Sequence, residues 1–226
     1  MYSGKHLSRN TVSIYAPVQY GDHVLDPHDL YEMVHDPGAS ALTTLAAAVD
    51  ARDKGTSGHS ERVTKYAVNT AKALGLTRED VDRLQVAGLL HDVGKLGIPE
   101  EVLLKRSSLT CGEMKLVREH AAIGKAILER VPQMDIVLPA VLHHHERWDG
   151  QGYPDGLVGE HIPMLARILA VADAYDAMTS DRPYRKALLP EEAARELRKN
   201  AGVQFDAEVV EAFLNAVRES AEKKAA

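Results

Sequence analysis

Two short segments of this chain place histidine and aspartate where they could bind a metal ion. His91 and Asp92 are adjacent and are followed by Lys95, and a second segment carries the pair His144 and His145. Imidazole nitrogens and carboxylate oxygens together suit hard or borderline divalent cations. Such cations activate water against phosphate esters. The two segments therefore predict a metal-dependent phosphodiesterase.

The elements that must position these residues are predicted to be helices. From residue 41 onward apolar residues recur with helical spacing, and helices are expected over about 41–53, 60–74, 77–91, 110–130, 134–146, 164–179, 190–201 and 207–221. Four polar residues fall on the apolar stripes of four different helices: His91, His120, His144 and Asp173. An inward polar group without a partner costs about 1–3 kcal/mol. Metal ions shared between the helices would satisfy all four, so we predict an all-α bundle around a metal centre.

Capping residues support several of these boundaries. Thr77 with Asp80, and Thr110 with Glu113, have the spacing of capping boxes or near capping boxes. Asp206 is expected to cap the last helix.

Composition limits the class of protein. The chain has 226 residues, 45% of them hydrophobic and 5% aromatic, which suits one helical domain with an appended segment. A net charge of −6 argues against binding of nucleic-acid polymers, although two bound dications would make the site attractive to a small phosphate. Cys111 is the single cysteine, so no intrachain disulfide can form and a reducing compartment is favoured. We find no run of about 18 apolar residues and no signal peptide, and therefore expect a soluble, cytoplasmic protein without membrane contact.

Residues 1–40 differ from the rest of the chain. They contain Pro17, Pro27 and Pro37 and show no sustained helical period. We interpret 1–40 as an N-terminal linker and 41–226 as the functional domain.

Longer motifs make the chain resemble the HD-GYP family, a subgroup of the HD phosphohydrolase superfamily. The match runs from about Leu42 to Phe213 and keeps the family's order. It comprises Gly58-His59-Ser60, His91-Asp92-x-Gly94-Lys95, His120 with Gly124, His144-His145-Glu146 to Gly152-Tyr153-Pro154, Val171-Ala172-Asp173-x-x-Asp176, and Asp181-Arg182-Pro183-Tyr184-Arg185. The resemblance implies an HD-domain helical bundle with a binuclear metal site at its centre.

The resemblance also implies a ligand set. One metal would be held by His59, His91, Asp92 and Asp173, and the second by His120, His144 and His145, with Asp92 as the bridge. Nitrogen and oxygen ligands without a thiolate favour iron or manganese over zinc. Some family members bind a third metal through a glutamate that corresponds here to Gly55, so two divalent ions are expected.

Three residues are candidates for the chemical step. Lys95 is expected to stabilise the charge that develops on phosphorus; the alternative is a solvated lysine at a helix end. Asp92 contributes as the bridging ligand. Asp176 lies one turn beyond Asp173 and could orient the attacking hydroxide or accept a proton; a helix cap or a salt bridge is its alternative role.

Substrate contacts are expected from two loops. In the family, residues at Arg182 and Arg185 contact the phosphate that is not cleaved; an exposed, solvated arginine pair is the alternative. Gly152 and Pro154 would fix the backbone of the other loop, and Tyr153 would offer a stacking face or a hydroxyl.

The resemblance implies hydrolysis of cyclic di-GMP to pGpG, with a further step to GMP. A 3′,3′-cyclic GMP-AMP phosphodiesterase is the main alternative, because the two substrates differ only at base edges. Residues 1–12 resemble the C-terminal tail of a GGDEF domain, with Ser8 where that pattern has glycine. An upstream regulatory domain, a GGDEF partner and a homodimer would all fit this resemblance.

Two further alternatives belong to different classes. Another HD-type phosphohydrolase could act on nucleotides or cyclic mononucleotides, but the intact Gly152-Tyr153-Pro154 segment and the arginine pair argue against it. A module that binds the dinucleotide without cleaving it would be expected to have lost ligands, and every expected ligand position is filled.

Overall fold

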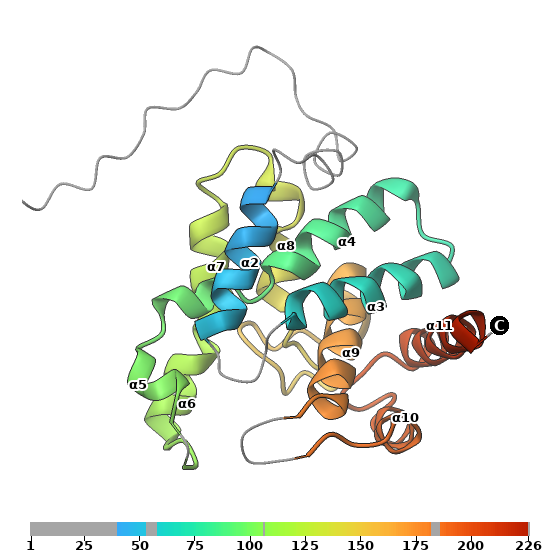
Figure 1. Cartoon of the computed structure of the whole chain (residues 1–226). Coiled ribbons are helices and arrows are strands. Elements are labelled where there is room, and N and C mark those ends of the chain that lie inside the picture. The colour runs from blue at the N-terminus through green and yellow to red at the C-terminus, as the bar shows by residue number, and fades with distance from the viewer. Residues whose placement is uncertain (1–39, 53–57, 106, 182–185, 226) are drawn as a thin grey trace, which may run out of the picture.

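A computed structural model describes residues 40–52, 58–105, 107–181 and 186–225 (Figure 1). Residues 1–39 of the predicted linker at 1–40, which include the segment resembling a GGDEF tail, lie outside the described residues, and so do Gly55, Arg182 and Arg185. All elements in the described ranges are helices, and these ranges contain no strand. The all-α fold class is confirmed.

The chain folds into ten α-helices and three short 3-10 helices within the described residues. In chain order these are α2 (Ser40–Arg52), α3 (His59–Ala73), α4 (Arg78–Leu90), η2 (Val93–Gly97), α5 (Glu100–Leu103), α6 (Cys111–Arg118), α7 (His120–Leu128), η3 (Met134–Ile136), α8 (Leu138–His143), η4 (Gly159–His161), α9 (Met164–Thr179), α10 (Pro190–Lys199) and α11 (Ala207–Ala225).

The centre of the molecule is built by α3, α4, α8 and α9, which pack against one another. Leu84 and Leu90 of α4 and Leu169 of α9 are fully buried there. On the other side of α3 and α9, α11 closes the core with Phe213, which meets the rings of Tyr66 and Tyr175. In Figure 1, α5 and α6 extend from the lower left of this bundle. None of the described helices is both long and apolar enough to cross a lipid bilayer.

The structure agrees with several predicted helix ends. Helix α9 spans Met164–Thr179, as the apolar period predicted. The Thr77 hydroxyl accepts a hydrogen bond from Asp80 N, and Thr110 and Glu113 form a complete capping box. Asp206 accepts a hydrogen bond from Glu208 N at the start of α11. Local sequence therefore determines these ends.

Two predictions of a single long helix were wrong, because the structure has two shorter helices in each place. The predicted helix over 110–130 breaks at Glu119 into α6 and α7. The predicted helix over 134–146 becomes η3 and α8, and α8 ends at His143. Pro139 lies in the first turn of α8, where its missing N–H costs nothing. Inside one continuous helix the same proline would have removed a hydrogen bond.

Candidate metal centre

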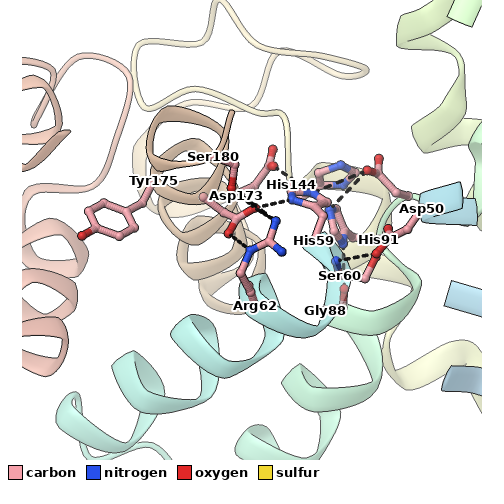
Figure 2. A network of polar contacts seen from close by, with 12 residues as sticks. Asp50, His59, Ser60, Arg62, Gly88, His91, His144, Asp173, Tyr175 and Ser180 are labelled. Atoms are coloured by element: carbon pink, nitrogen blue, oxygen red, sulfur yellow. Dashed lines mark hydrogen bonds and ion pairs between the residues drawn. The ribbon is translucent and has the colours of Figure 1, made fainter. Parts of the chain in front are cut away.

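The first group of candidate ligands joins three helices. His59 is the first residue of α3, His91 follows the last residue of α4, and Asp173 lies in α9. One ligand atom from each lies within 4.8 Å of the others. Figure 2 shows the side chains of His59, His91 and Asp173 converging from these helices. Sequence-distant elements thus bring the predicted ligands of the first metal together.

The second group is made only of imidazoles. His120 is the first residue of α7, and His144 and His145 lie in the turn that follows α8. Their ligand atoms also lie within 4.8 Å of one another. His120 Nε2 and His144 Nε2 are 3.3 Å apart. The same three residues were predicted to hold the second metal.

Asp92 lies between the two groups, with one carboxylate oxygen toward each. Its Oδ2 is 3.8 Å from His59 Nε2 and 3.6 Å from His91 Nε2. Its Oδ1 is 3.4 Å from His120 Nε2. A carboxylate in this position has the arrangement required of a ligand that bridges two ions.

Backbone carbonyls fix the orientation of three of these imidazoles. Nδ1 of His91, His120 and His144 each lies 2.7 Å from the carbonyl oxygen three residues earlier, in Gly88, Val117 and Val141. A carbonyl oxygen can only accept, so each Nδ1 carries the proton. Each Nε2 then carries no proton, and its lone pair is directed toward the centre, as in histidines that bind metal ions.

These lone pairs have no adequate protein partner. His91 Nε2 is buried and makes no hydrogen bond to any described residue. The facing Nε2 atoms of His120 and His144 are both acceptors, so no proton lies between them. Unsatisfied buried acceptors are costly, and divalent cations would satisfy all of them. The donor set therefore fits two metal ions held by nitrogen and oxygen.

Carboxylates dominate the electrostatics of the first group. Burial lowers the pKa of His59, but hydrogen bonds to Asp173 and Asp176 outweigh it and raise that pKa to about 10. Burial also acts to raise the pKa of Asp92, yet Lys95 and the surrounding imidazoles hold it well below its usual range. The same balance, with His59 as the main partner, keeps the pKa of Asp173 low. Both carboxylates are therefore ionised.

Burial dominates the electrostatics of the second group. It lowers the pKa of His145 to about 4, with the neighbouring imidazoles adding to the effect. It also lowers the pKa of His120 and, more strongly, that of His144. All three rings are neutral near pH 7, which is the form that binds metal ions.

Close backbone packing holds Asp92 beside His120. Gly94, two residues after Asp92, lies against the start of α7. A Cβ at Gly94 would be 1.8 Å from His120 O and 2.5 Å from Gly124 N. Only glycine permits this approach. The contact places the Asp92 carboxylate within reach of the second group.

Helix α2 supports two segments of the site: the start of α3 and the region around the end of η2. Asp50 accepts hydrogen bonds from Ser60 N and Ser60 Oγ at 3.1 and 2.8 Å, next to His59 (Figure 2). Arg52 donates to Leu96 O at 2.8 Å and to Ile98 O at 3.3 Å. One helix therefore ties the start of α3 to η2, the 3-10 helix that carries Lys95.

Lys95 points into the centre. Its Nζ lies 2.8 Å from Asp92 Oδ2, and the side chain is only 16% exposed. This places a cation beside the Asp92 carboxylate, so Lys95 does not lie in the position of a solvated lysine at a helix end.

Asp176 is buried behind the first group. Its Oδ2 lies 2.7 Å from His59 Nδ1, and its Oδ1 accepts from Arg62 Nε at 2.6 Å. Ser180 Oγ is 3.4 Å from Oδ2. These contacts match the salt-bridge alternative for Asp176. Its carboxylate orients His59 so that His59 Nε2 faces Asp173, 3.4 Å away.

The loop after the histidine pair is held by Glu146. Its buried carboxylate accepts hydrogen bonds from the backbone N–H groups of Asp155, Gly156 and Leu157 at 2.7, 3.1 and 3.1 Å. Within this loop Gly152 lies against Glu146, since a Cβ there would be 2.4 Å from Glu146 Cα. Pro154 is exposed at the outer edge of the loop.

This anchoring places Tyr153 beside the second group. Its ring stacks on His145, with centroids 4.9 Å apart and planes at 30°. Its backbone N–H lies 3.3 Å from His145 O. Burial raises the pKa of the Tyr153 hydroxyl, with Asp173 and Asp92 adding to the effect, so the phenol stays neutral.

Sequence reasoning did not assign roles to Glu146 and Arg62. Glu146 directly follows the histidine pair and precedes a glycine-rich loop, which was the available signal. Arg62 lies one helical turn after His59, on the same face of α3. Its carboxylate partner is 114 residues away, so the pairing needed tertiary structure.

In this bundle, buried histidines and aspartates from separate helices converge on a candidate metal centre, which defines a class of helical fold. The family model described as "HD domain" matches residues 43–209. The chain belongs to the HD domain family.

Two similar proteins have names that are consistent with membership of the HD domain family. The chain is 44% identical to a cyclic di-GMP phosphodiesterase response regulator of Xanthomonas campestris, over 80% of this chain and 48% of that protein. It is 37% identical to the 3'3'-cGAMP-specific phosphodiesterase 2 of Vibrio cholerae, over 75% of this chain and 33% of that protein. The chain spans about half the length of the first relative and about a third of the length of the second.

A solved structure shares the fold. The crystal structure of a cyclic GMP-AMP specific phosphodiesterase of V. cholerae matches with a TM-score of 0.62 at 20% identity, covering 80% of this chain and 48% of the other. At this identity the likeness concerns the fold alone.

Proposed function

We propose that this chain is a metal-dependent cyclic dinucleotide phosphodiesterase of the HD-GYP subgroup, which hydrolyses cyclic di-GMP to pGpG, with hydrolysis of pGpG to GMP as an optional second step. The observation that carries the proposal is the position of Asp92, with one oxygen toward each of two groups of buried ligands. Relatives named as cyclic di-GMP and 3'3'-cGAMP phosphodiesterases support the substrate class.

The first ion would be held by His59, His91, Asp92 and Asp173, and the second by Asp92, His120, His144 and His145. Iron or manganese remains our prediction for these positions. When bound, such ions supply the chemistry of phosphodiester hydrolysis, because they lower the pKa of water and neutralise charge on the phosphate.

The protein's own residues position the reaction. Lys95 Nζ, 2.8 Å from the bridging carboxylate, can turn its remaining N–H groups toward a phosphate and stabilise charge that develops there. Asp176 and Arg62 hold the His59 ring in place from behind. We assign Asp176 to this positioning role, since its carboxylate already binds His59 and Arg62.

The substrate would lie against the loop anchored by Glu146. Gly152 and Pro154 shape this loop, and Tyr153 lies at its inner side, next to His145. Arg182 and Arg185 remain our predicted contacts to the phosphate that is not cleaved. An upstream regulatory domain ending in the segment at 1–12, a GGDEF partner and a homodimer also remain predictions.

A preference for 3′,3′-cyclic GMP-AMP is the second candidate function, because a relative specific for it is 37% identical. Incubation of the chain with Mn(II) or Fe(II) and each dinucleotide, followed by chromatography, separates the two. The proposal predicts pGpG as the first product from cyclic di-GMP, and none after chelation. Faster cleavage of cyclic GMP-AMP would favour the second candidate. Intact substrates after long incubation with either metal would leave only a binding role.

A further inference from the structure

Arg118 lies at the edge of the metal centre and belongs to no assigned role. It is the last residue of α6, two positions before His120. Its guanidinium carbon lies over the ring of Tyr153, 5.2 Å from the ring centroid. The Tyr153 ring in turn stacks on His145, at 4.9 Å. Arg118, Tyr153 and His145 thus form a continuous series of planar groups that leads to the second ligand group.

Three other cations near the centre, among the residues that the structure describes, are already paired with carboxylates. Lys95 binds Asp92, Arg62 binds Asp176, and Arg147 binds Asp149 through two hydrogen bonds. Arg118 is exposed, and among the described residues its contact is with the Tyr153 ring and not with a carboxylate. The guanidinium is therefore available to a ligand.

The helix that carries Arg118 contributes little to the core. Helix α6 has no buried residue and extends from the bundle with α5 (Figure 1). Packing therefore does not explain why α6 ends with its last side chain over an aromatic ring of the site. A planar ligand that stacks on the face of the Arg118 guanidinium turned away from Tyr153 would explain it.

The chemistry of the pair selects the ligand. Guanidinium and phenol are both planar, and nucleobases stack on aromatic rings and on arginine planes. A scissile phosphate at the ligand groups would leave the flanking bases of a dinucleotide at the periphery, where Arg118 and Tyr153 lie. We propose that Arg118 and Tyr153 form a platform on which one nucleobase of the cyclic dinucleotide stacks. This inference rests on the proposed function.

The test compares Arg118→Ala and Arg118→Lys with the wild-type chain, each loaded with Mn(II). With cyclic di-GMP we expect Arg118→Ala to raise KM by about tenfold and to change kcat by less than twofold, because base stacking is lost. Arg118→Lys keeps the charge but loses the plane, and we expect its KM to lie close to that of Arg118→Ala. Methyl p-nitrophenyl phosphate has no nucleobase, so its kcat/KM should be the same for all three proteins.

Lys115→Ala is the matched control, since Lys115 is an exposed cation on the same helix. Its KM should equal that of the wild type. A wild-type KM for Arg118→Lys would assign Arg118 to a phosphate and overturn the platform, and so would an unchanged KM for Arg118→Ala. Equal losses with both substrates would point to a disturbed metal centre and also overturn it. If the wild type cleaves methyl p-nitrophenyl phosphate but no cyclic dinucleotide, the proposed function fails, and this inference fails with it.

Discussion

The two ligand groups that share Asp92 differ in their charge. Carboxylates raise the pKa of His59 in the first group to about 10, whereas burial lowers the pKa of His145 in the second to about 4. An ion that enters the first group must therefore displace a proton, while the second group is already neutral. Similar ligands thus acquire different properties from their surroundings: carboxylates beside His59 in the first group, and burial among other imidazoles in the second.

The largest effect is expected from the residue common to both groups. Asp92→Ala should abolish turnover and empty at least one metal position, because the two groups lose their shared oxygen ligands. Metal analysis and product chromatography on the same sample would measure both effects. Circular dichroism would establish that the variant keeps its helices. Full occupancy together with normal turnover would disprove the bridge.

Single-ligand variants should separate the two groups. His91→Ala should remove the ion of the first group, and His120→Ala that of the second, so each variant should retain about one ion per chain. Activity should fall steeply in both, because two ions are needed to hold and activate the phosphate. Paramagnetic spectra of Mn(II)-loaded variants would report which environment remains. Identical spectra from the two variants would contradict the existence of two distinct groups.

A smaller effect is expected from the residue behind His59. Asp176→Asn should weaken the ion of the first group by about 10–100-fold, the usual cost of losing a residue that orients a metal ligand. Binding to the second group should not change. Ser180→Ala is the matched control, because Ser180 Oγ contacts the same carboxylate at 3.4 Å without touching His59. Equal weakening of both groups by Asp176→Asn would remove the positioning role.

The smallest effect is on stability. The ligand groups form only when separate helices pack together, so we expect metal ions to bind the folded chain far more tightly than the unfolded chain. An ion at 100 times its Kd should then stabilise the folded chain by about 2.7 kcal/mol. For a domain of this size that corresponds to a Tm increase of roughly 5–10 °C. Thermal unfolding before and after chelation measures it. A Tm that chelation leaves unchanged would mean that the buried imidazoles have found other partners.

Much of the fold could be predicted because its determinants are local. The apolar period of Met164–Thr179 and the capping residues Thr77, Thr110 and Asp206 act within one or two turns of the helices they define. The break at Glu119 could not be predicted in this way. Its backbone keeps helical angles, φ −66° and ψ −15°, so the apolar period continues across it.

The candidate ligands could also be named from the sequence, because each is a polar residue on an apolar stripe or part of a motif. The residues that position them could not be assigned so easily. Arg62 and Asp176 are 114 residues apart, and no period or spacing relates them. Glu146 binds backbone N–H groups, which every residue type except proline provides, so its partners leave no signal in the sequence.

The number of ions bound per chain tests the central claim most directly. The chain would be loaded with Mn(II), freed of excess metal by gel filtration, and analysed for manganese and protein. Two groups joined by Asp92 predict two ions per chain. One ion, none, or three tightly bound ions would contradict the binuclear centre.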